Sequence, residues 1–173
     1  MEIEIVTKDP LMLVGFSFFG DPFAASGGWT EENEIGRLWS RFGTYLEQHG
    51  GEIQHAKDLH VGYEVHIEHP DTPAKGHYEV FVGVEVSQLE DVPLTLLVKM
   101  LPPAQYAMLT LAGEQITMDW SRKIYSEWLP AAGYQAVQGY MFERYDERFK
   151  GLENLEESVM EIYVPVQRSA DSD

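Results

Sequence analysis

Glu143 is the residue whose setting points most directly to chemistry, because the strand-like segment around it is mostly apolar and aromatic. An ionised carboxylate in such surroundings costs several kcal/mol unless water, a partner or a ligand compensates its charge. Alternation along a strand puts Met141 and Tyr145 on the same face as Glu143. We therefore expect these three side chains to line a binding cleft. The alternative is a solvent-facing glutamate, or one paired with Arg144 or Arg148.

Aromatic rings supply the other candidate contacts, because their faces attract a cation or stack on a flat ligand, contributing about 0.5 to 2 kcal/mol each. Tyr163 is expected to face the cleft, since alternation places it opposite Ile162 and Val164, which should pack under the helices. The remaining ligand-binding candidates are Tyr63, Tyr106, Trp39, Trp120 and Phe19. Ordinary core packing is the competing explanation for each of these rings. Phe19 also borders a Gly-rich stretch, residues 20–29, that is a candidate lid.

Metal and cofactor chemistry find little support in the sequence. The spacing His66-x-x-His69 would point the two rings to opposite faces of a strand, so no metal site is predicted. Glu64 corresponds roughly to Glu143 in an internal repeat, yet its neighbours form an apolar face, so we expect it at the solvent or at the rim of the cleft. The chain contains no P-loop, dinucleotide fingerprint or Gly-x-Ser-x-Gly motif, and no cofactor is predicted.

The internal repeat relates residues 34–86 to residues 115–166. Three short matches occur in the same order in both segments, which rarely happens by chance. They are Ile35-x-x-x-Trp39-Ser40-Arg41 with Ile116-x-x-x-Trp120-Ser121-Arg122, Tyr63-Glu64-Val65 with Phe142-Glu143-Arg144, and residues 79–84 with residues 161–166. Two such halves folded side by side would leave a cleft between them.

Each half is predicted to have the order strand, helix, strand, strand. The first half has strands at residues 11–19, 59–67 and 78–86, and a helix at 31–49 with Thr30 as its N-cap. The second half has strands at residues 94–100 (broken by Pro102-Pro103), 106–111, 137–145 and 159–167, and a helix at 114–129. We therefore expect an α+β fold made of two modules, residues 1–90 and 91–173, that together form one domain.

Composition limits the partners. The formal charge is -17, from 29 acidic and 12 basic residues, so direct binding to nucleic acid is unfavourable. An acidic field attracts small cations and basic protein surfaces, although solubility is the simpler explanation. Without a long apolar run or a basic N-terminal flank, no membrane association is predicted and a cytoplasmic location is expected. The absence of cysteine excludes disulfides and thiolate chemistry.

Taken together, the two modules resemble the GyrI-like family, small-molecule-binding domains that also serve as the effector-binding half of multidrug-sensing transcription activators. The resemblance is carried by Pro103-Ala104-Gln105-Tyr106-Ala107, Trp128-Leu129-Pro130 before Gly133-Tyr134, Phe142-Glu143-Arg144-Tyr145 and Glu161-Ile162-Tyr163-Val164-Pro165-Val166. It implies a pseudo-twofold pair of modules, an antiparallel sheet with helices on one side, and an aromatic pocket between the halves. In such proteins the glutamate that matches Glu143 faces cationic, lipophilic ligands. The chain lacks the helix-turn-helix of the activators, so a stand-alone ligand-binding domain is expected.

The leading functional hypothesis is a binding module that holds a cationic or lipophilic aromatic molecule without turning it over. The alternatives that the resemblance implies are a hydrolase of reactive, cyclopropane-type electrophiles, in which Glu143 would position water, and a protein partner that inhibits gyrase or a similar target. The sequence alone leaves open whether the protein is an enzyme.

Overall fold

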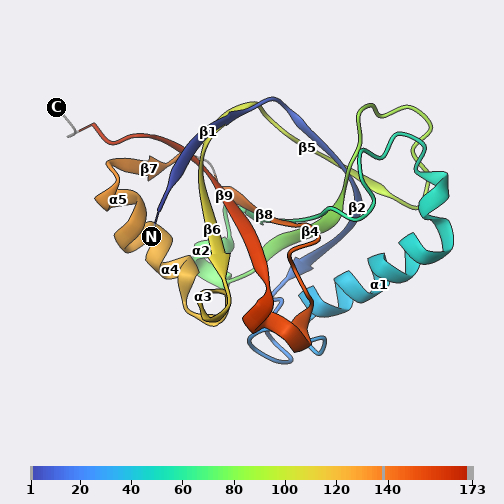
Figure 1. The fold of residues 1–173 in the computed structure, drawn as a ribbon, viewed down its shortest axis with the longest axis horizontal. Helices are drawn as coiled ribbons and strands as arrows, with labels where there is room; N and C mark the ends of the chain where they lie inside the picture. Colours follow the sequence, from blue (N-terminus) through green and yellow to red (C-terminus); the bar gives the residue numbers. More distant parts are fainter. Residues whose placement is uncertain (1, 138, 171–173) are drawn as a thin grey trace.

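The computed structural model describes residues 2–137 and 139–170 and consists of one large antiparallel sheet with helices packed on one side (Figure 1). Within these residues the strands are β1 (Glu4–Lys8), β2 (Leu11–Gly20), β3 (Gly62–Glu68), β4 (Tyr78–Glu85), β5 (Leu97–Leu101), β6 (Ala104–Ala112), β7 (Tyr134–Ala136), β8 (Tyr140–Tyr145) and β9 (Val159–Arg168). The strand order is β1-β6-β9-β8-β3-β4-β2-β5, and β7 pairs with β9. The predicted α+β fold with an antiparallel sheet is confirmed.

The central pair of the sheet is β3 with β8, one strand from each half of the sequence. Reading outward from this pair, the order is β4 then β2 on one side and β9 then β6 on the other. The pseudo-twofold relation and the division into modules 1–90 and 91–173 are compatible with this order and remain predictions. In the register of the central pair, Glu64 lies directly opposite Glu143. Cross-strand partners share a face of the sheet, so both carboxylates point to the same side.

Helix α1 (Glu34–His49) covers the first half of the sheet and begins later than predicted. Its N-cap is Asn33, not Thr30: the Asn33 side chain accepts a hydrogen bond from the Gly36 amide at 2.9 Å, which satisfies one of the unpaired N–H groups of the first turn. The Asn33 side-chain amide also donates to the Gly28 carbonyl at 2.8 Å, which ties the Gly-rich loop to the helix. The buried residues of α1 are Leu38, Phe42 and Tyr45.

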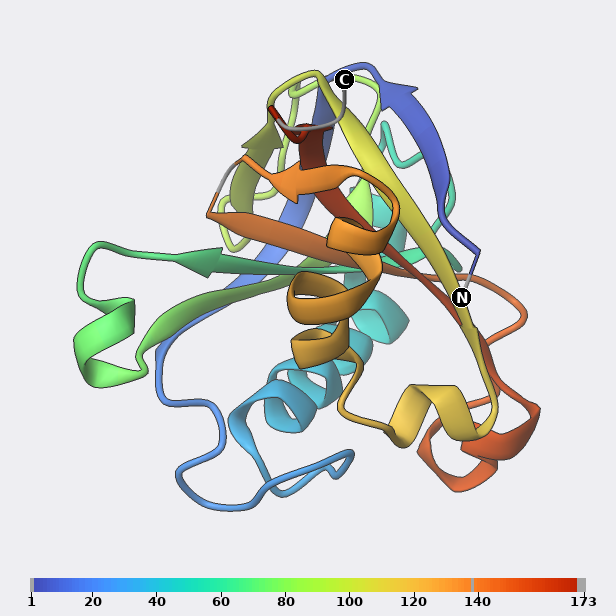
Figure 2. The ribbon, with the colours of Figure 1, turned by 90° about the vertical axis from the view of Figure 1, so that its left-hand side faces the viewer.

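The prediction of one continuous helix at residues 114–129 is wrong, because this segment is divided into several short helices. Its pieces are α3 (Glu114–Thr117), α4 (Trp120–Lys123), the π-helix η2 (Ile124–Trp128) and α5 (Leu129–Ala131). Met118 has extended backbone angles, and the Asp119 side chain then accepts a hydrogen bond from the Arg122 amide. A second N-cap therefore restarts the helix. Figure 2 shows α1 and these shorter helices on the same side of the sheet, and Figure 1 shows that they lie at opposite ends of it.

Several short elements were not predicted. They are β1, β7, the 3-10 helices η1 (Gly50–Glu52) and η3 (Leu152–Glu157), and the one-turn helix α2 (Thr72–Lys75) in the turn between β3 and β4. The sheet has an apolar core on each face. On the face turned away from the helices, Tyr63, Tyr106, Phe142 and Tyr163 pack together with aliphatic side chains. Among the described residues, no helix has the length and apolarity needed to cross a membrane.

Candidate functional site

A pocket of about 960 Å³ opens on the helix side of the sheet, over the central strands β3 and β8. One wall comes from the first half of the chain, namely the loop at residues 28–33 and helix α1. The other wall comes from the second half, from residues 117–121 and from residues 146–152 after β8. The floor therefore lies where the two halves of the sequence meet. Among the described lining residues, five are acidic, two are histidines and none is a lysine or arginine.

Two carboxylates form the centre of the floor. Glu64 is 4% exposed and Glu143 is 2% exposed. Each uses one oxygen to accept a hydrogen bond from an aromatic side chain: the Trp39 indole Nε1 donates to Glu64 Oε2 at 2.6 Å, and the Tyr145 hydroxyl donates to Glu143 Oε2. These donors fix the orientation of both carboxylates, and the other oxygen of each is turned toward the third polar residue of the floor.

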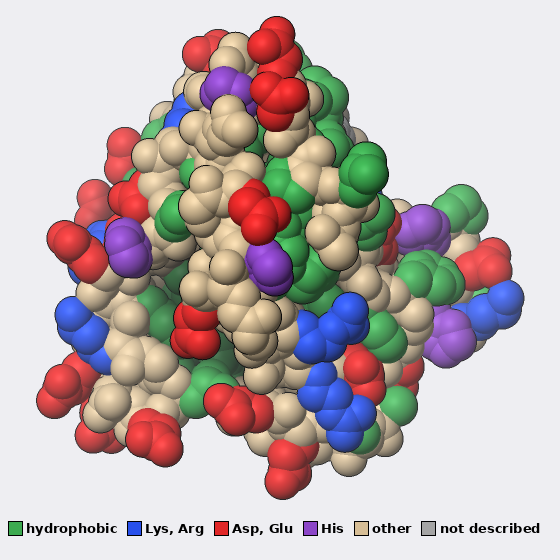
Figure 3. Space-filling view, turned by 90° about the vertical axis from the view of Figure 1, so that its right-hand side faces the viewer, with side chains coloured by type: hydrophobic (Ala, Val, Ile, Leu, Met, Phe, Trp, Pro, Cys, Tyr) green, Lys and Arg blue, Asp and Glu red, His purple; other side chains and the backbone are tan. Residues whose placement is uncertain are grey.

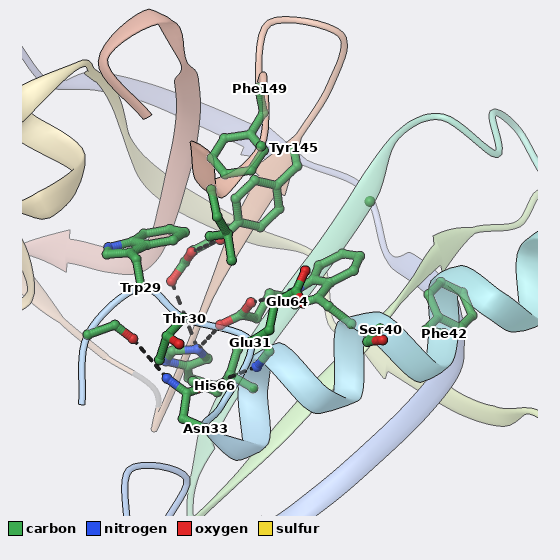
Figure 4. A pocket seen from close by; sticks show the side chains of 18 of the residues that line it. Trp29, Thr30, Glu31, Asn33, Ser40, Phe42, Glu64, His66, Tyr145 and Phe149 are labelled. Carbon is green, nitrogen blue, oxygen red and sulfur yellow. Dashed lines mark hydrogen bonds and ion pairs between the residues drawn. The ribbon is translucent and has the colours of Figure 1, made fainter. Parts of the chain in front are cut away.

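That third residue is His66, which follows Glu64 by two positions on β3 and so points to the same face. Its Nε2 atom lies 2.6 Å from Glu64 Oε1 and 3.9 Å from Glu143 Oε1. Figure 4 shows Glu64 and His66 turned toward one another below Tyr145 and Phe149. Burial alone would lower the pKa of His66, but the hydrogen bond and charge of Glu64, together with the charge of Glu143, raise it above its usual value.

The surroundings of Glu143 disfavour the ionised form of its carboxyl group. Burial, reinforced by repulsion from Glu64, raises the pKa of Glu143 to about 8, although His66 and the Tyr145 hydroxyl act in the opposite direction. Burial and the two carboxylates also hold the pKa of Tyr145 well above its usual value, so this hydroxyl stays a donor. A positive charge in the pocket would favour the ionised form of Glu143.

Aromatic side chains form the walls above this floor. Trp39 and Tyr145 meet edge to face with ring centroids 5.6 Å apart, and Tyr145 meets Phe149 in the same way at 4.8 Å. Trp29, on the loop before α1, lies 6.1 Å from Phe149, and its indole N–H donates to the Ile116 carbonyl at 3.1 Å. This contact joins the two walls. Trp120 lines the side contributed by the second half.

Comparison with known proteins assigns this chain to a family. Residues 4–166 match the family model Cass2, described as integron-associated effector binding protein. The chain belongs to this family. It is a GyrI-like domain, as its motifs indicated, and the family's shared property is the binding of small-molecule effectors.

Individual relatives agree with this assignment. The transcriptional regulator BrlR of Pseudomonas aeruginosa is 30% identical over 168 residues, which cover 96% of this chain and 56% of the regulator. The chain therefore spans just over half the length of that relative. Two solved structures share the fold. SAV2435 bound to tetraphenylphosphonium has a TM-score of 0.63 and 17% identity, and the match covers 96% of this chain and 94% of that one. The Vibrio cholerae integron cassette protein has a TM-score of 0.62 and 15% identity, and the match covers 95% of each chain.

In this effector-binding domain, four of the candidate residues line one pocket. They are Glu143, Tyr145, Trp39 and Trp120. Met141 shares their face of the sheet but lies deeper, in the core cluster with Ile124 and Leu129. It is therefore covered by the helices of the second half and does not line the pocket.

The other predicted aromatic residues lie elsewhere. Tyr163 stacks on Phe142 on the opposite face of the sheet, with centroids 4.6 Å apart, and the Tyr163 hydroxyl donates to Glu161 at 2.8 Å. Tyr63 and Tyr106 lie in the same cluster as Tyr163. Phe19 is 55% exposed and packs its ring edge against His69 rather than against the pocket. The placement of Tyr163 in the cleft was wrong because the pocket lies on the helix side, the side that Ile162 faces.

The structure also brings in residues that sequence reasoning missed. Glu64 was expected at the solvent or the rim, but it is buried on the floor, and His66 lies beside it. The signal was present: Glu64 and His66 alternate with Tyr63 and Val65, so a strand with one apolar face carried two ionisable groups on the other. Trp29 and Phe149 were also missed as wall residues.

Proposed function

We propose that this domain binds a cationic, lipophilic aromatic molecule in the pocket between its halves, without turning it over. Glu64 supplies negative charge, Glu143 adds to it when the cation favours its ionised form, and the rings of Trp29, Trp39 and Trp120 surround the apolar part of the ligand. The buried pair of carboxylates is the observation that carries the proposal. A positively charged ligand would compensate their charge in a place where no lysine or arginine lines the described part of the pocket.

The walls favour an aromatic, lipophilic ligand over a small hydrated cation. Ring faces that line a partly desolvated cavity attract cations and stack on flat groups, and each such contact contributes on the order of 0.5 to 2 kcal/mol. A cavity of about 960 Å³ has room for a molecule with several rings. The structural relative SAV2435, which binds the lipophilic cation tetraphenylphosphonium, shares this fold and gives a practical probe.

The test compares a cation with a neutral molecule that has similar rings. Tetraphenylphosphonium and neutral triphenylphosphine oxide would be titrated into the protein, with quenching of tryptophan fluorescence as the readout. We expect Glu143→Gln to weaken phosphonium binding by about tenfold or more, since glutamine cannot ionise beside the cation as Glu143 can, and to change the affinity for the oxide little. Glu47→Gln, on the exposed side of α1, is the matched control. Equal phosphonium affinity in Glu143→Gln and wild type would remove the electrostatic part of the proposal.

Hydrolysis is the second candidate, because Glu64 and His66 form a hydrogen-bonded pair at the pocket floor. A carboxylate that orients an imidazole can help it act as a general base toward water that attacks a cyclopropane carbon. The electron pair of the broken carbon–carbon bond moves into the conjugated carbonyl group, and the neutral form of Glu143 could donate a proton to that carbonyl oxygen. Incubation with a cyclopropane-bearing electrophile, followed by mass spectrometry, tests this directly. A hydrated product that His66→Gln fails to form would support catalysis, whereas recovery of unchanged compound from wild type would leave binding as the function.

A further inference from the structure

We propose that Glu64, His66 and Glu143 form a binding site for a divalent transition-metal ion at the floor of the pocket. This site goes beyond the organic ligand proposed above and depends on different chemistry, namely coordination bonds from one nitrogen and two oxygens. The three groups each offer a ligand atom, and these atoms all lie within 4.8 Å of one another.

The sheet itself sets this geometry. Glu64 and His66 are two residues apart on β3 and therefore share a face, and Glu143 lies directly opposite Glu64 on β8. Two donors bound tetrahedrally at about 2.0 to 2.1 Å from one ion lie roughly 3.3 Å apart. The distances from His66 Nε2 to the two Oε1 atoms, 2.6 and 3.9 Å, lie on either side of that value. Shifts of well under 1 Å would bring each His66–carboxylate pair to this spacing, and the two carboxylate donors, which lie within 4.8 Å of one another, would have to come to about the same separation.

The groups around the donors resemble the outer shell of a metal site. Carboxylates that bind metals are usually held by hydrogen bonds from neighbouring groups. Here Trp39 and Tyr145 donate to the Oε2 atoms of Glu64 and Glu143, and each Oε1 atom is left on the side of His66. Both donors belong to half-buried rings on the pocket wall, so the orientation of the two carboxylates does not depend on mobile surface chains.

An unpartnered oxygen supplies an independent reason to expect a ligand here. Within the described residues, Glu143 Oε1 accepts no hydrogen bond, and the nearest basic atom is His66 Nε2 at 3.9 Å. The Glu143 side chain as a whole is almost fully buried, but Oε1 itself is open to the pocket: among the described residues, Tyr45 Oη is the side-chain atom that is both buried and without a partner. Buried carboxylates in proteins are usually hydrogen-bonded, paired or bound to a metal. A divalent ion would satisfy this oxygen and compensate both carboxylates at once.

The donor set indicates which class of ion fits. Imidazole suits zinc, iron, nickel and copper, and carboxylates also bind manganese, whereas no thiolate is available in this cysteine-free chain. Three protein ligands leave at least one coordination position open toward the cavity. Zn²⁺ and Co²⁺ are therefore suitable probes, since Co²⁺ adopts similar sites and its visible absorption reports on their geometry.

The experiment measures binding of Zn²⁺ by calorimetry and of Co²⁺ by absorption, using protein dialysed against a chelator. We expect one equivalent to bind, and His66→Gln and Glu143→Gln each to lower the affinity by at least tenfold. His69→Gln is the control, because His69 lies near Glu79 on the exposed side of the same hairpin and should leave the affinity unchanged. No saturable site in wild type, or equal affinity in His66→Gln, would overturn the proposal. If His66→Gln fails to fold, wild-type stoichiometry and the intensity of the Co²⁺ bands decide the question.

A second variant separates this proposal from the organic-ligand proposal. Trp120 lines the wall but offers no donor to the ion, so Trp120→Ala should weaken tetraphenylphosphonium binding and leave Zn²⁺ affinity within about twofold of wild type. Metal binding without phosphonium binding in wild type would contradict only the proposed function. Phosphonium binding without metal binding would contradict only the metal site.

Discussion

Carboxylates near the pocket fall into two groups that differ in where their positive charge comes from. Asp146, which lines the pocket rim, is paired with Arg148 through both of its oxygens at 2.9 and 2.8 Å and also with Arg144 at 2.7 Å. Glu143, three residues earlier, faces no arginine, and its pKa is raised rather than lowered. The protein therefore favours the ionised form of Asp146, and it disfavours the ionised form of Glu143 unless a positive charge enters the cavity.

Arg148 should stabilise the fold in a pH-dependent way. Hydrogen bonds from Arg148 are the main cause of the lowered pKa of Asp146. Burial alone would raise the pKa of Glu161, but interactions with Arg148, Tyr163 and Arg144 lower that pKa below its usual value. Because both pKa values are lower in the folded protein than in the unfolded chain, the stabilisation is present above their ordinary values of 3.8 and 4.5 and is lost as the pH falls through the folded values.

The measurement is urea unfolding of Arg148→Gln at several pH values. At pH 7 we expect the variant to be less stable by about 1 kcal/mol, a modest figure because Arg148 is partly exposed to solvent. The difference between variant and wild type should shrink as the pH is lowered below about 4. Arg122→Gln is the control, since its pair with Asp119 is exposed and 3.5 Å long. A difference that grows on acidification would contradict the assignment.

At the scale of elements, helix α1 contains two glycines, of which one positions the pocket wall and the other does not. A Cβ atom on Gly36 would lie 2.2 Å from the Thr30 carbonyl oxygen, so the loop can cross close to the helix only where a side chain is missing. A Cβ atom on Gly43 would meet nothing within 4 Å. The first glycine brings residues 28–33 to the pocket wall, and the second only lowers helix stability.

Alanine at these two positions should therefore have opposite effects. Gly43→Ala should raise the free energy of unfolding by about 0.5 to 1 kcal/mol, because glycine in a helix interior is less favourable than alanine. Gly36→Ala should lower it by about 1 to 3 kcal/mol, because the backbone of the loop must shift. Urea denaturation of the two single variants checks both signs in the same helix, and a stabilising Gly36→Ala would show that the loop is not held against α1.

Local signals predicted the elements well, whereas contacts between distant segments were harder to predict. The bounds of β2 and β4 were close because turn residues bound their apolar runs, Asp21 and Pro22 after β2 and Gly76 before β4. The break at Met118 was missed because Ile116, Trp120 and Ile124 keep helical spacing across it. The burial of Glu64 depends on the register of β3 with β8, which places it opposite Glu143, 79 positions further along the chain. Alternation within a single strand does not reveal which face a second layer covers.

At the scale of the whole molecule, strand pairing joins the two halves at three places. Besides the central pair β3–β8, the edge strand β1 pairs with β6 of the second half, and the edge strand β5 pairs with β2 of the first. The pocket floor therefore belongs to neither half alone. Any movement of one half relative to the other would have to disturb these ladders, which favours a preformed cleft with adjustable side chains.

The net charge of the molecule acts on a ligand before it reaches this cleft. The chain carries a formal charge of -17, and Figure 3 shows acidic side chains spread over the face at the α1 end of the molecule. A field of one sign around a cavity raises the local concentration of oppositely charged ligands and speeds their association. Salt screens exposed charges over about 10 Å at 0.1 M, so this contribution is separable from contacts inside the pocket.

Stopped-flow quenching of tryptophan fluorescence measures the association rate constant of tetraphenylphosphonium. We expect this rate constant to fall several-fold between about 0.02 and about 0.5 M salt, because salt screens the field that steers the cation to the protein. The dissociation rate constant should change much less, because it depends on the buried carboxylates and the rings around them, which salt screens weakly. Neutral triphenylphosphine oxide, if it binds, should show no such decrease. Equal salt dependence for the cation and the neutral molecule would mean that the surface charge serves solubility alone and that only the pocket distinguishes the two.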